Sequence, residues 1–188
     1  PHYLPYDENH PIAPVNVYGK TKYFIEQIIC DWTKAHKDRR GVLLRYFNPI
    51  GAHQSGLIGE NPRGKPNNLM PLLLQVAMRQ RDNLSVCGTD YDTVDGSGVR
   101  DYLHVCDLAA GHVAALDYLD ICSGVEAINL GTGRGTSVLQ LIRCFEDATS
   151  QSVPYRIAER RLGDVATSVA DPARAEIVLR WIAKRSVT

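Results

Sequence analysis

Apolar residues recur along this chain with two spacings, one typical of amphipathic helices and one typical of short buried strands. From about Val17 to His36 the apolar residues lie three and four positions apart, which predicts a helix with one apolar stripe. Asn16 precedes this stretch and has a side chain suited to cap its first turn. The stripe consists of Phe24, Ile25, Ile28, Ile29 and Trp32.

A short, largely apolar run from Val42 to Phe47 follows Gly41 and predicts a buried strand. A helix followed by a buried strand is half of a β-α-β unit, which favours the α/β fold class with a parallel sheet. The same reasoning predicts further helices from Leu69 to about Arg81, from Asp107 as a cap to about Leu119, and from Val138 to Ala148. It also predicts strands at 84–87, 127–130 and 154–157, polar loops at 48–67 and 90–98, and a short helix after Asp171.

Composition and charge exclude several classes of protein. The chain has 188 residues with 21 basic and 21 acidic side chains, so no overall field favours nucleic acid or an anionic membrane surface. No apolar run reaches the roughly 18 residues that identify a membrane helix. The five cysteines follow no metal-binding spacing, and reduced thiols of this kind predict a cytoplasmic protein. Because the chain begins at Pro1 rather than Met, we expect it to be part of a longer protein.

Tyr18 and Lys22 give the strongest chemical signal in the sequence. Their spacing of four residues places both side chains on one face of the predicted helix. A Lys ammonium beside a phenol stabilises the phenolate, which can then take a proton from a sugar or alcohol hydroxyl near neutral pH. The same spacing occurs on ordinary solvated helix faces, so its functional interpretation depends on the motifs around it.

The segment from Gly131 to Gly135 follows a predicted strand and precedes a predicted helix, as a dinucleotide-binding turn does. Thr136 stands where that fingerprint has a third Gly, and no acidic residue ends a following strand at the required distance. We therefore interpret the segment as a structural turn rather than a phosphate cradle.

Two carboxamides and several arginines are candidates for binding an anion. Asn67 and Asn68 lie at a predicted helix entrance, where they either cap the helix or help its free N–H groups to hold a phosphate oxygen. Arg100 and the turn from Arg160 to Asp164 suit a diphosphate, although a surface salt bridge is the simpler explanation for any single arginine. Asp164 either accepts hydrogen bonds from sugar hydroxyls or pairs with Arg161. The histidines show no ligand spacing, so we predict no metal site.

Taken in order, several segments resemble the UDP-glucose 4-epimerases, a family of extended short-chain dehydrogenases/reductases. The similar region extends from the first residues to about Trp181. The Arg-Tyr-Phe-Asn-Pro and Pro-Asn-Asn-Leu-Met-Pro motifs narrow the resemblance from the superfamily to the epimerases. The segments are Tyr18 to Lys22, Leu44 to Pro49, Gly51 to His53, Pro66 to Pro71, Gly98 to Tyr102, Asn129 to Gly133 and Arg160 to Asp164.

The resemblance implies NAD-dependent interconversion of UDP-glucose and UDP-galactose, a step of galactose metabolism. In this reaction Tyr18, as phenolate, takes the proton of the sugar 4-hydroxyl while hydride passes from C4 to NAD⁺. Lys22 supports the phenolate and holds the nicotinamide ribose. The 4-keto sugar then turns over, and hydride returns to its opposite face. The resemblance also implies a homodimer whose interface includes the helix with Tyr18.

Further site residues follow from the resemblance alone. It implies that residues 1–50 end a Rossmann-type NAD-binding domain and that 51–188 are mostly a small α/β UDP-sugar-binding domain, truncated at its C-terminus. Phe47, near the nicotinamide, joins Tyr18 and Lys22 as a cofactor-binding residue. The substrate-binding residues are Tyr46, Phe47, Asn48, Asn67, Asn68, Leu69, Ser85, Val86, Cys87, Arg100, Arg161, Asp164 and Ser168.

Several departures from the family pattern lead to specific expectations. Cys87 replaces the usual Phe against the uracil, so we expect stacking of the nucleotide to weaken by about 1–3 kcal/mol. Ser168 is a Tyr in some relatives, and the smaller side chain leaves room for an N-acetyl group on the sugar. We therefore expect the N-acetylhexosamine pair to be substrates as well. Leu162 replaces an acidic residue, which nothing in the sequence explains.

The family's glycine-rich phosphate turn and its catalytic Ser or Thr lie upstream of Pro1, so we expect the isolated chain to be inactive. Two alternatives remain open. One is another nucleotide-sugar enzyme of the superfamily, such as a 4,6-dehydratase or a decarboxylase, which shares Tyr-x-x-x-Lys but lacks the Asn-Asn-Leu-Met-Pro turn. The other is a non-catalytic remnant that binds a UDP-sugar, which the missing cofactor turn favours.

Overall fold

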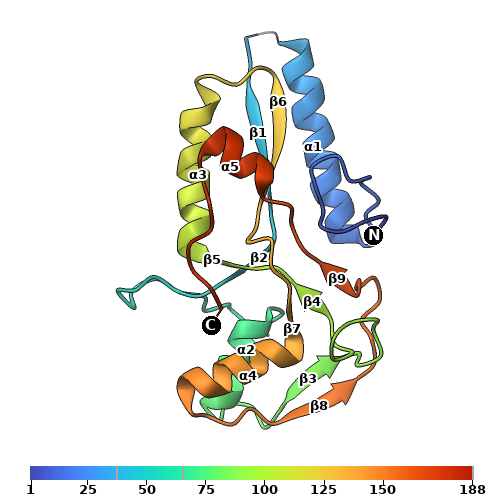
Figure 1. The fold of residues 1–188 in the computed structure, drawn as a ribbon, viewed down its shortest axis with the longest axis vertical. Coiled ribbons are helices and arrows are strands. Elements are labelled where there is room, and N and C mark those ends of the chain that lie inside the picture. The colour runs from blue at the N-terminus through green and yellow to red at the C-terminus, as the bar shows by residue number, and fades with distance from the viewer. Residues whose placement is uncertain (37, 65, 188) are drawn as a thin grey trace.

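A computed structural model describes residues 1–36, 38–64 and 66–187 of the chain. Within these ranges the chain forms two halves that follow one another along the long axis of the molecule (Figure 1). Each half has its own apolar core. Short strands occupy the junction between the halves (Figure 1).

The upper half is built on two parallel strands, β1 (Gly41–Tyr46) and β6 (Val125–Leu130). Helix α1 (Val17–Ala35) lies on one side of this pair, whereas α3 (Val105–Leu119) and α5 (Ala173–Leu179) lie on the other (Figure 1). The upper core lies on the side of α3 and α5. Its buried side chains are Leu103, Leu108, Ala115, Ile128, Leu130, Ala175, Leu179 and Trp181.

The lower half packs two helices, α2 (Leu69–Ala77) and α4 (Val138–Thr149), against the parallel strands β3 (Leu84–Cys87) and β8 (Tyr155–Ala158). Side chains of β3 alternate between the core and the opposite face, as the pleat of a strand requires. Leu84 and Val86 are therefore buried, whereas Ser85 and Cys87 are partly accessible.

Short strands join the two halves. Strand β2 (Asn48–Ile50) pairs in parallel with β5 (Tyr102–His104). Strand β4 (Val99–Arg100) pairs with β7 (Thr136–Ser137) and with β9 (Thr167–Ser168). The N-terminal loop reaches the same region through a bridge between Tyr6 and Ala170. Segments far apart in the sequence therefore meet at the junction.

The structure confirms the predicted α/β fold class and most of the predicted elements. Asn16 caps α1, because its Oδ1 accepts a hydrogen bond from the Gly19 N–H at 2.8 Å. Helix α2 ends earlier than predicted, at Ala77, and Arg79 just beyond it has a left-handed φ of 56°. The predicted long loop is interrupted at its start by β2.

The prediction that Asp107 caps a helix is wrong. The helix begins at Val105, and its cap is His104, whose Nδ1 accepts a hydrogen bond from the Cys106 N–H at 3.1 Å. The Asp107 carboxylate instead accepts hydrogen bonds from the backbone N–H groups of Lys184 and Arg185, both at 2.8 Å. Asp107 therefore anchors the C-terminal tail, a role that required knowledge of the tertiary fold.

The apolar stripe of α1 lies mostly on its outer face. Phe24 and Ile28 are 60% and 67% exposed, whereas Ile29 is partly buried. On the inner face, the Glu26 carboxylate pairs with the Arg45 guanidinium of β1 at 2.7 Å. In the described part of the chain, α1 thus meets the strands through this ion pair and through Ile29, and most of its apolar stripe faces solvent. None of the helices described here is long and apolar enough to cross a membrane.

Candidate functional site

A cleft of about 240 Å³ lies at the junction of the two halves. Strands β3 and β8 are parallel, so Cys87 and Ala158 end at the same edge, and the segment after β8 continues there with Arg161. Ligands of α/β proteins commonly bind beyond the carboxyl ends of parallel strands. The cleft brings together the predicted residues Asn48, Asn67, Asn68, Leu69, Ser85, Cys87, Arg100, Arg161 and Asp164.

Arg100 is fixed on the cleft wall by its own chain. Its Nη1 donates hydrogen bonds to the carbonyl oxygens of Val99 at 2.8 Å and Val165 at 2.9 Å. Its Nη2 lies 3.6 Å from the Asp164 carboxylate, so the ion pair of Asp164 is with Arg100 and not with Arg161. The Arg161 side chain forms no ion pair within the described residues, which leaves its guanidinium available to an anion in the cleft.

Asn68 lies at the N-cap position of α2, but its side chain does not cap the helix. Its Nδ2 instead donates a hydrogen bond to Glu60 Oε1 at 2.6 Å. The Asn68 side chain therefore accepts no hydrogen bond from the first N–H groups of α2. Asn68 and Leu69 both line the cleft. Of the two interpretations of this turn, the arrangement favours an anion at the helix N-terminus.

Tyr18 and Lys22 lie together on the first turns of α1, as their spacing predicts. The Lys22 Nζ is 5.3 Å from the centroid of the Tyr18 ring, and the Tyr18 side chain is 69% exposed. Lys22 also lines a larger hollow of about 620 Å³, together with Phe47 and the N-terminal loop. Lys22, but not Tyr18, thus lines a hollow different from the cleft.

Four predicted residues line neither hollow: Tyr18, described above, and Tyr46, Val86 and Ser168. Tyr46 ends β1, half exposed, with its ring 5.9 Å from that of His112. The Val86 side chain is buried in the lower core, so only its backbone remains near the cleft edge. Ser168 lies opposite Arg100 in the register of β9 and β4, which places it beside a cleft residue.

The turn after β6 has the structural role that the sequence indicated. The N–H groups of Thr132 and Gly133 donate hydrogen bonds to the Asp101 carboxylate at 2.9 and 3.0 Å. The Asp101 side chain is fully buried and also accepts a hydrogen bond from the Ala170 N–H at 3.3 Å. Because a carboxylate of the chain already occupies these donors, the turn does not hold a phosphate.

Sequence reasoning missed Tyr91 and Tyr102, which also line the cleft. Burial raises the pKa of Tyr102 to about 12, although the charge of Arg100 opposes the rise. Tyr102 therefore stays a neutral phenol near neutral pH and is unsuited to accept a proton there. Of the two, Tyr91 could more readily have been found from the sequence, because it is an aromatic residue among polar loop residues close to Cys87.

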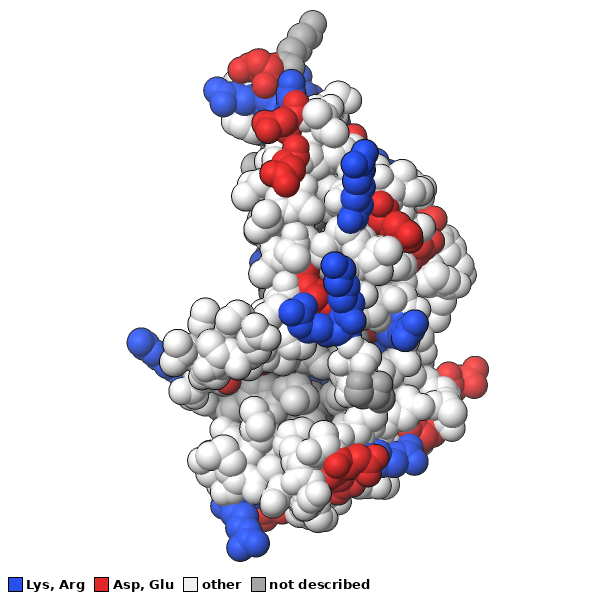
Figure 2. Space-filling view, turned by 60° about the vertical axis from the view of Figure 1, so that its left-hand side comes forward, with Lys and Arg blue, Asp and Glu red and all other residues white. Residues whose placement is uncertain are grey.

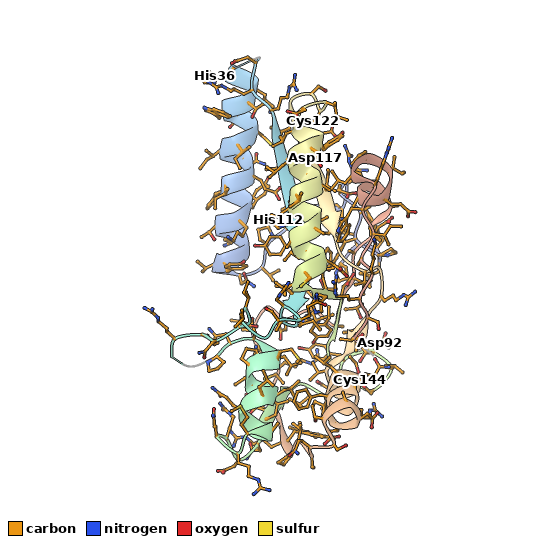
Figure 3. The ribbon with its side chains drawn as sticks, turned by 90° about the vertical axis from the view of Figure 1, so that its left-hand side faces the viewer. His36, Asp92, His112, Asp117, Cys122 and Cys144 are labelled. Carbon is orange, nitrogen blue, oxygen red and sulfur yellow. The ribbon has the colours of Figure 1, made fainter. Side chains whose placement is uncertain are left out.

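Charged side chains and side chains of the types that can bind metals are dispersed over the described part of the chain. On the face shown in Figure 2, side chains of both signs are spread from top to bottom and form no single large patch. His36, His112, Cys122 and Cys144 lie on different parts of the fold (Figure 3). Within the described ranges, no group of three or more potential ligands is arranged to hold a metal ion. All five cysteines are free thiols.

Residues 1–131 match the family described as the NAD dependent epimerase/dehydratase family. The UDP-glucose 4-epimerase of Homo sapiens is 54% identical over 184 residues, which are 97% of this chain and 53% of that protein. The UDP-glucose 4-epimerase of Bacillus subtilis (strain 168) is 52% identical over 187 residues, 100% of this chain and 55% of that protein.

The solved structures include a similar fold with ligands. The crystal structure of UDP-glucose 4-epimerase from Bifidobacterium longum in complex with NAD⁺ and UDP is 49% identical and superposes with a TM-score of 0.95. The match covers 98% of this chain and 55% of that one. The chain therefore spans about half the length of the relatives that it matches.

Proposed function

We propose, from the premise that this chain belongs to the NAD dependent epimerase/dehydratase family, that it is the C-terminal part of a UDP-glucose 4-epimerase. The proposed reaction is the NAD-dependent interconversion of UDP-glucose and UDP-galactose in galactose metabolism. A single observation carries the proposal: the cleft gathers a free arginine, a fixed arginine, three asparagines and an acidic residue. In this proposal residues 1–50 end the NAD-binding domain and residues 51–188 mostly bind the UDP-sugar, although α3, β6 and α5 of the second range pack in the upper half.

The cleft residues are proposed to hold the UDP group. Arg161 and the N-terminus of α2 suit the diphosphate, because a guanidinium and free N–H groups both donate to phosphate oxygens. Arg100 is held by two backbone carbonyls, so it provides a fixed positive charge in the cleft. Asp164 beside it accepts hydrogen bonds from ribose or sugar hydroxyls. Firm binding of the nucleotide leaves the sugar free to present either face to Tyr18.

Tyr18 is the proposed proton acceptor from the sugar 4-hydroxyl, and it returns the proton when the sugar is reduced again. The Lys22 ammonium beside the ring stabilises the phenolate. The residues around the larger hollow fit one end of a nicotinamide cofactor, since Lys22 donates hydrogen bonds and Phe47 offers an aromatic surface. When bound, NAD takes up and returns a hydride. The turn at Gly131 contributes nothing to its phosphates, because Asp101 occupies those N–H groups.

Further features extend the proposal. Ser168, beside Arg100, leaves room for an N-acetyl group, so we include the N-acetylhexosamine pair among the substrates. The exposed apolar face of α1 supports a homodimer of the longer protein. The five free thiols support a cytoplasmic setting.

Two measurements on the purified chain test the proposal. Titration calorimetry with UDP should detect saturable binding, and UDP-glucose should compete with it. Absence of UDP binding would contradict the proposal. Denaturing the chain and assaying the supernatant for NAD then tests the cofactor site: we expect little NAD and no epimerase turnover by this chain alone. NAD in near-equal proportion to protein, or turnover, would show that the chain completes the cofactor site itself.

A further inference from the structure

Arg160 connects the two walls of the cleft from outside it. Its Nε donates a hydrogen bond to Asp90 Oδ1 at 2.7 Å, and its Nη2 donates to the Asp90 carbonyl oxygen at 2.5 Å. Asp90 belongs to the loop between β3 and β4, whereas Arg160 follows β8 and directly precedes Arg161. The contact therefore joins the loop that follows Cys87 to the segment that carries Arg161.

The same guanidinium stacks on Tyr91, the residue after Asp90. Its carbon lies 4.1 Å from the centroid of the Tyr91 ring, well within the range of a cation–π contact. Tyr91 lines the cleft and is 7% exposed. The ring and the Arg160 side chain converge on Gly88, where a Cβ atom would lie 2.7 Å from Tyr91 Cε2 and 2.8 Å from Arg160 Cγ.

The Tyr91 ring is held by packing rather than by its hydroxyl. The hydroxyl is buried and has no hydrogen-bond partner among the described residues. Gly88 lies against one edge of the ring, and Arg160 stacks on its face. Loss of Arg160 would therefore remove a main support of this cleft residue.

We propose that Arg160 is a positioning residue, which with Asp90 and Tyr91 fixes the cleft walls carrying Cys87 and Arg161 before the nucleotide binds. The proposal rests on the proposed function, because UDP is the ligand whose binding it assists. An ordered cleft loses less conformational entropy on binding, so the effect falls on nucleotide affinity. An exposed ion pair alone contributes little, but here two hydrogen bonds and a stacked ring converge on one guanidinium.

The ionisation of Asp90 is consistent with this arrangement. The hydrogen bond from Arg160, followed by the favourable charge of the same guanidinium, holds the pKa of Asp90 below its usual value. The carboxylate therefore stays charged throughout the pH range in which a nucleotide-binding protein works.

The first test is the affinity of the purified chain for UDP, measured by titration calorimetry. We expect Arg160→Ala to weaken UDP binding by about 3- to 10-fold, as the loss of a stacked, doubly hydrogen-bonded guanidinium suggests. Asp90→Ala should weaken it in the same way, and the double variant should lose less than the two single losses combined.

Arg143→Ala is the matched control. Arg143 lies 3.4 Å from Asp95, which belongs to the same loop as Asp90, but Arg143 does not line the cleft. Its removal therefore takes away a charge without disturbing the contacts of Arg160 with Asp90 and Tyr91. Arg160→Lys keeps the charge, lacks the planar stack and should remain weakened. Unchanged UDP affinity in Arg160→Ala, or an equal loss in Arg143→Ala, overturns the proposal.

Amide hydrogen exchange gives a readout that needs no ligand. The Tyr91 N–H donates to the Gly96 carbonyl at 2.9 Å and the Asp164 N–H to that of Arg161 at 3.1 Å, so both report on the two walls. Both should exchange faster in Arg160→Ala than in Arg143→Ala, with no matching fall in the melting temperature. If exchange is unaltered, the positioning role fails. If the amides exchange faster in Arg160→Ala but the unsubstituted chain binds no UDP, the proposed function fails instead. The proposed assistance to nucleotide binding then fails with it.

Discussion

The cleft at the junction and the Tyr18 face of α1 differ in how far this chain itself fixes their functional groups. In the cleft, Arg100 is held by two backbone carbonyls and Arg160 braces the walls. On α1, Tyr18 is 69% exposed, and within the described residues its ring has one ring contact, with the Lys22 ammonium. The comparison indicates that the chain fixes the side chains of the proposed nucleotide site, whereas it leaves the proposed proton-transfer pair exposed.

The largest expected effect concerns Asp101, because its buried carboxylate joins the turn after β6 to the segment before α5. Asp101→Ala removes the acceptor of the partly buried Thr132 N–H and of the buried Ala170 N–H, and each such group left unsatisfied costs about 1–3 kcal/mol. We expect the free energy of unfolding to fall by about 2–6 kcal/mol in urea denaturation. The exposed Asp117→Ala should change it little. A similar small change for both variants would contradict the anchoring role.

Arg161 should separate the two regions. A hydrogen bond to a charged group contributes about 1.5–3 kcal/mol, so we expect Arg161→Ala to weaken UDP binding by roughly 10- to 150-fold. Tyr18→Phe should leave UDP affinity unchanged, because Tyr18 does not line the cleft. Titration of both variants with UDP measures the difference. A large loss for Tyr18→Phe would mean that the two regions are not independent.

Substitution of Cys87 tests whether an aromatic side chain at this position would stack on the base of the nucleotide. Cys87→Phe should strengthen UDP binding by about 1–3 kcal/mol, the usual contribution of a base stacked on an aromatic ring. Cys87→Ser provides the control, since it changes the atom without adding a ring. Equal affinities for UDP in all three proteins would show that Cys87 does not meet the base.

The tail anchored by Asp107 should make stability depend on pH. Burial raises the pKa of Asp107, but hydrogen bonds from the backbone N–H groups of Arg185 and Lys184, then the Arg185 side chain, together hold it below its ordinary value of 3.8. The charged form therefore stabilises the fold above that value, and the contribution is lost as pH falls through the lower folded pKa.

Urea denaturation at several pH values checks this dependence. Asp107→Asn should be less stable than the unsubstituted chain at pH 7, and the gap should close in acid, below the ordinary value of 3.8. A gap that stays constant with pH would contradict the role of the charge. Asp117→Asn, at an exposed position, should show no gap.

The smallest effect is expected on the outer face of α1. Ile28→Ser should change the free energy of unfolding by less than about 0.5 kcal/mol, because Ile28 is exposed. Ile29→Ser should cost more than about 1 kcal/mol, since Ile29 packs towards Gly41 of β1. A large, concentration-dependent loss for Ile28→Ser would show instead that this chain already pairs through the stripe.

Local sequence signals predicted the elements well and the cleft in part. Asn16 caps α1 as expected, because a cap depends on neighbouring residues alone. The assignment of the Gly131 turn to a structural role was also correct. Tyr91 and its contact with Arg160 escaped sequence reasoning, because that contact joins loops 69 residues apart, the difference between 160 and 91. The long-range partner of Asp107 was missed for the same reason.

The sequence alone determined the spacing of Tyr18 and Lys22, the capped helix and the alternation of β3 that turns Ser85 and Cys87 away from the core. These properties depend on residues within a few positions of one another, where helix and strand geometry fix the outcome. The tertiary structure decided which polar groups meet. It joined Asp164 to Arg100, turned Asn68 towards Glu60 and left the apolar stripe of α1 in solvent. Such pairings depend on how distant segments pack, and no local pattern encodes that packing.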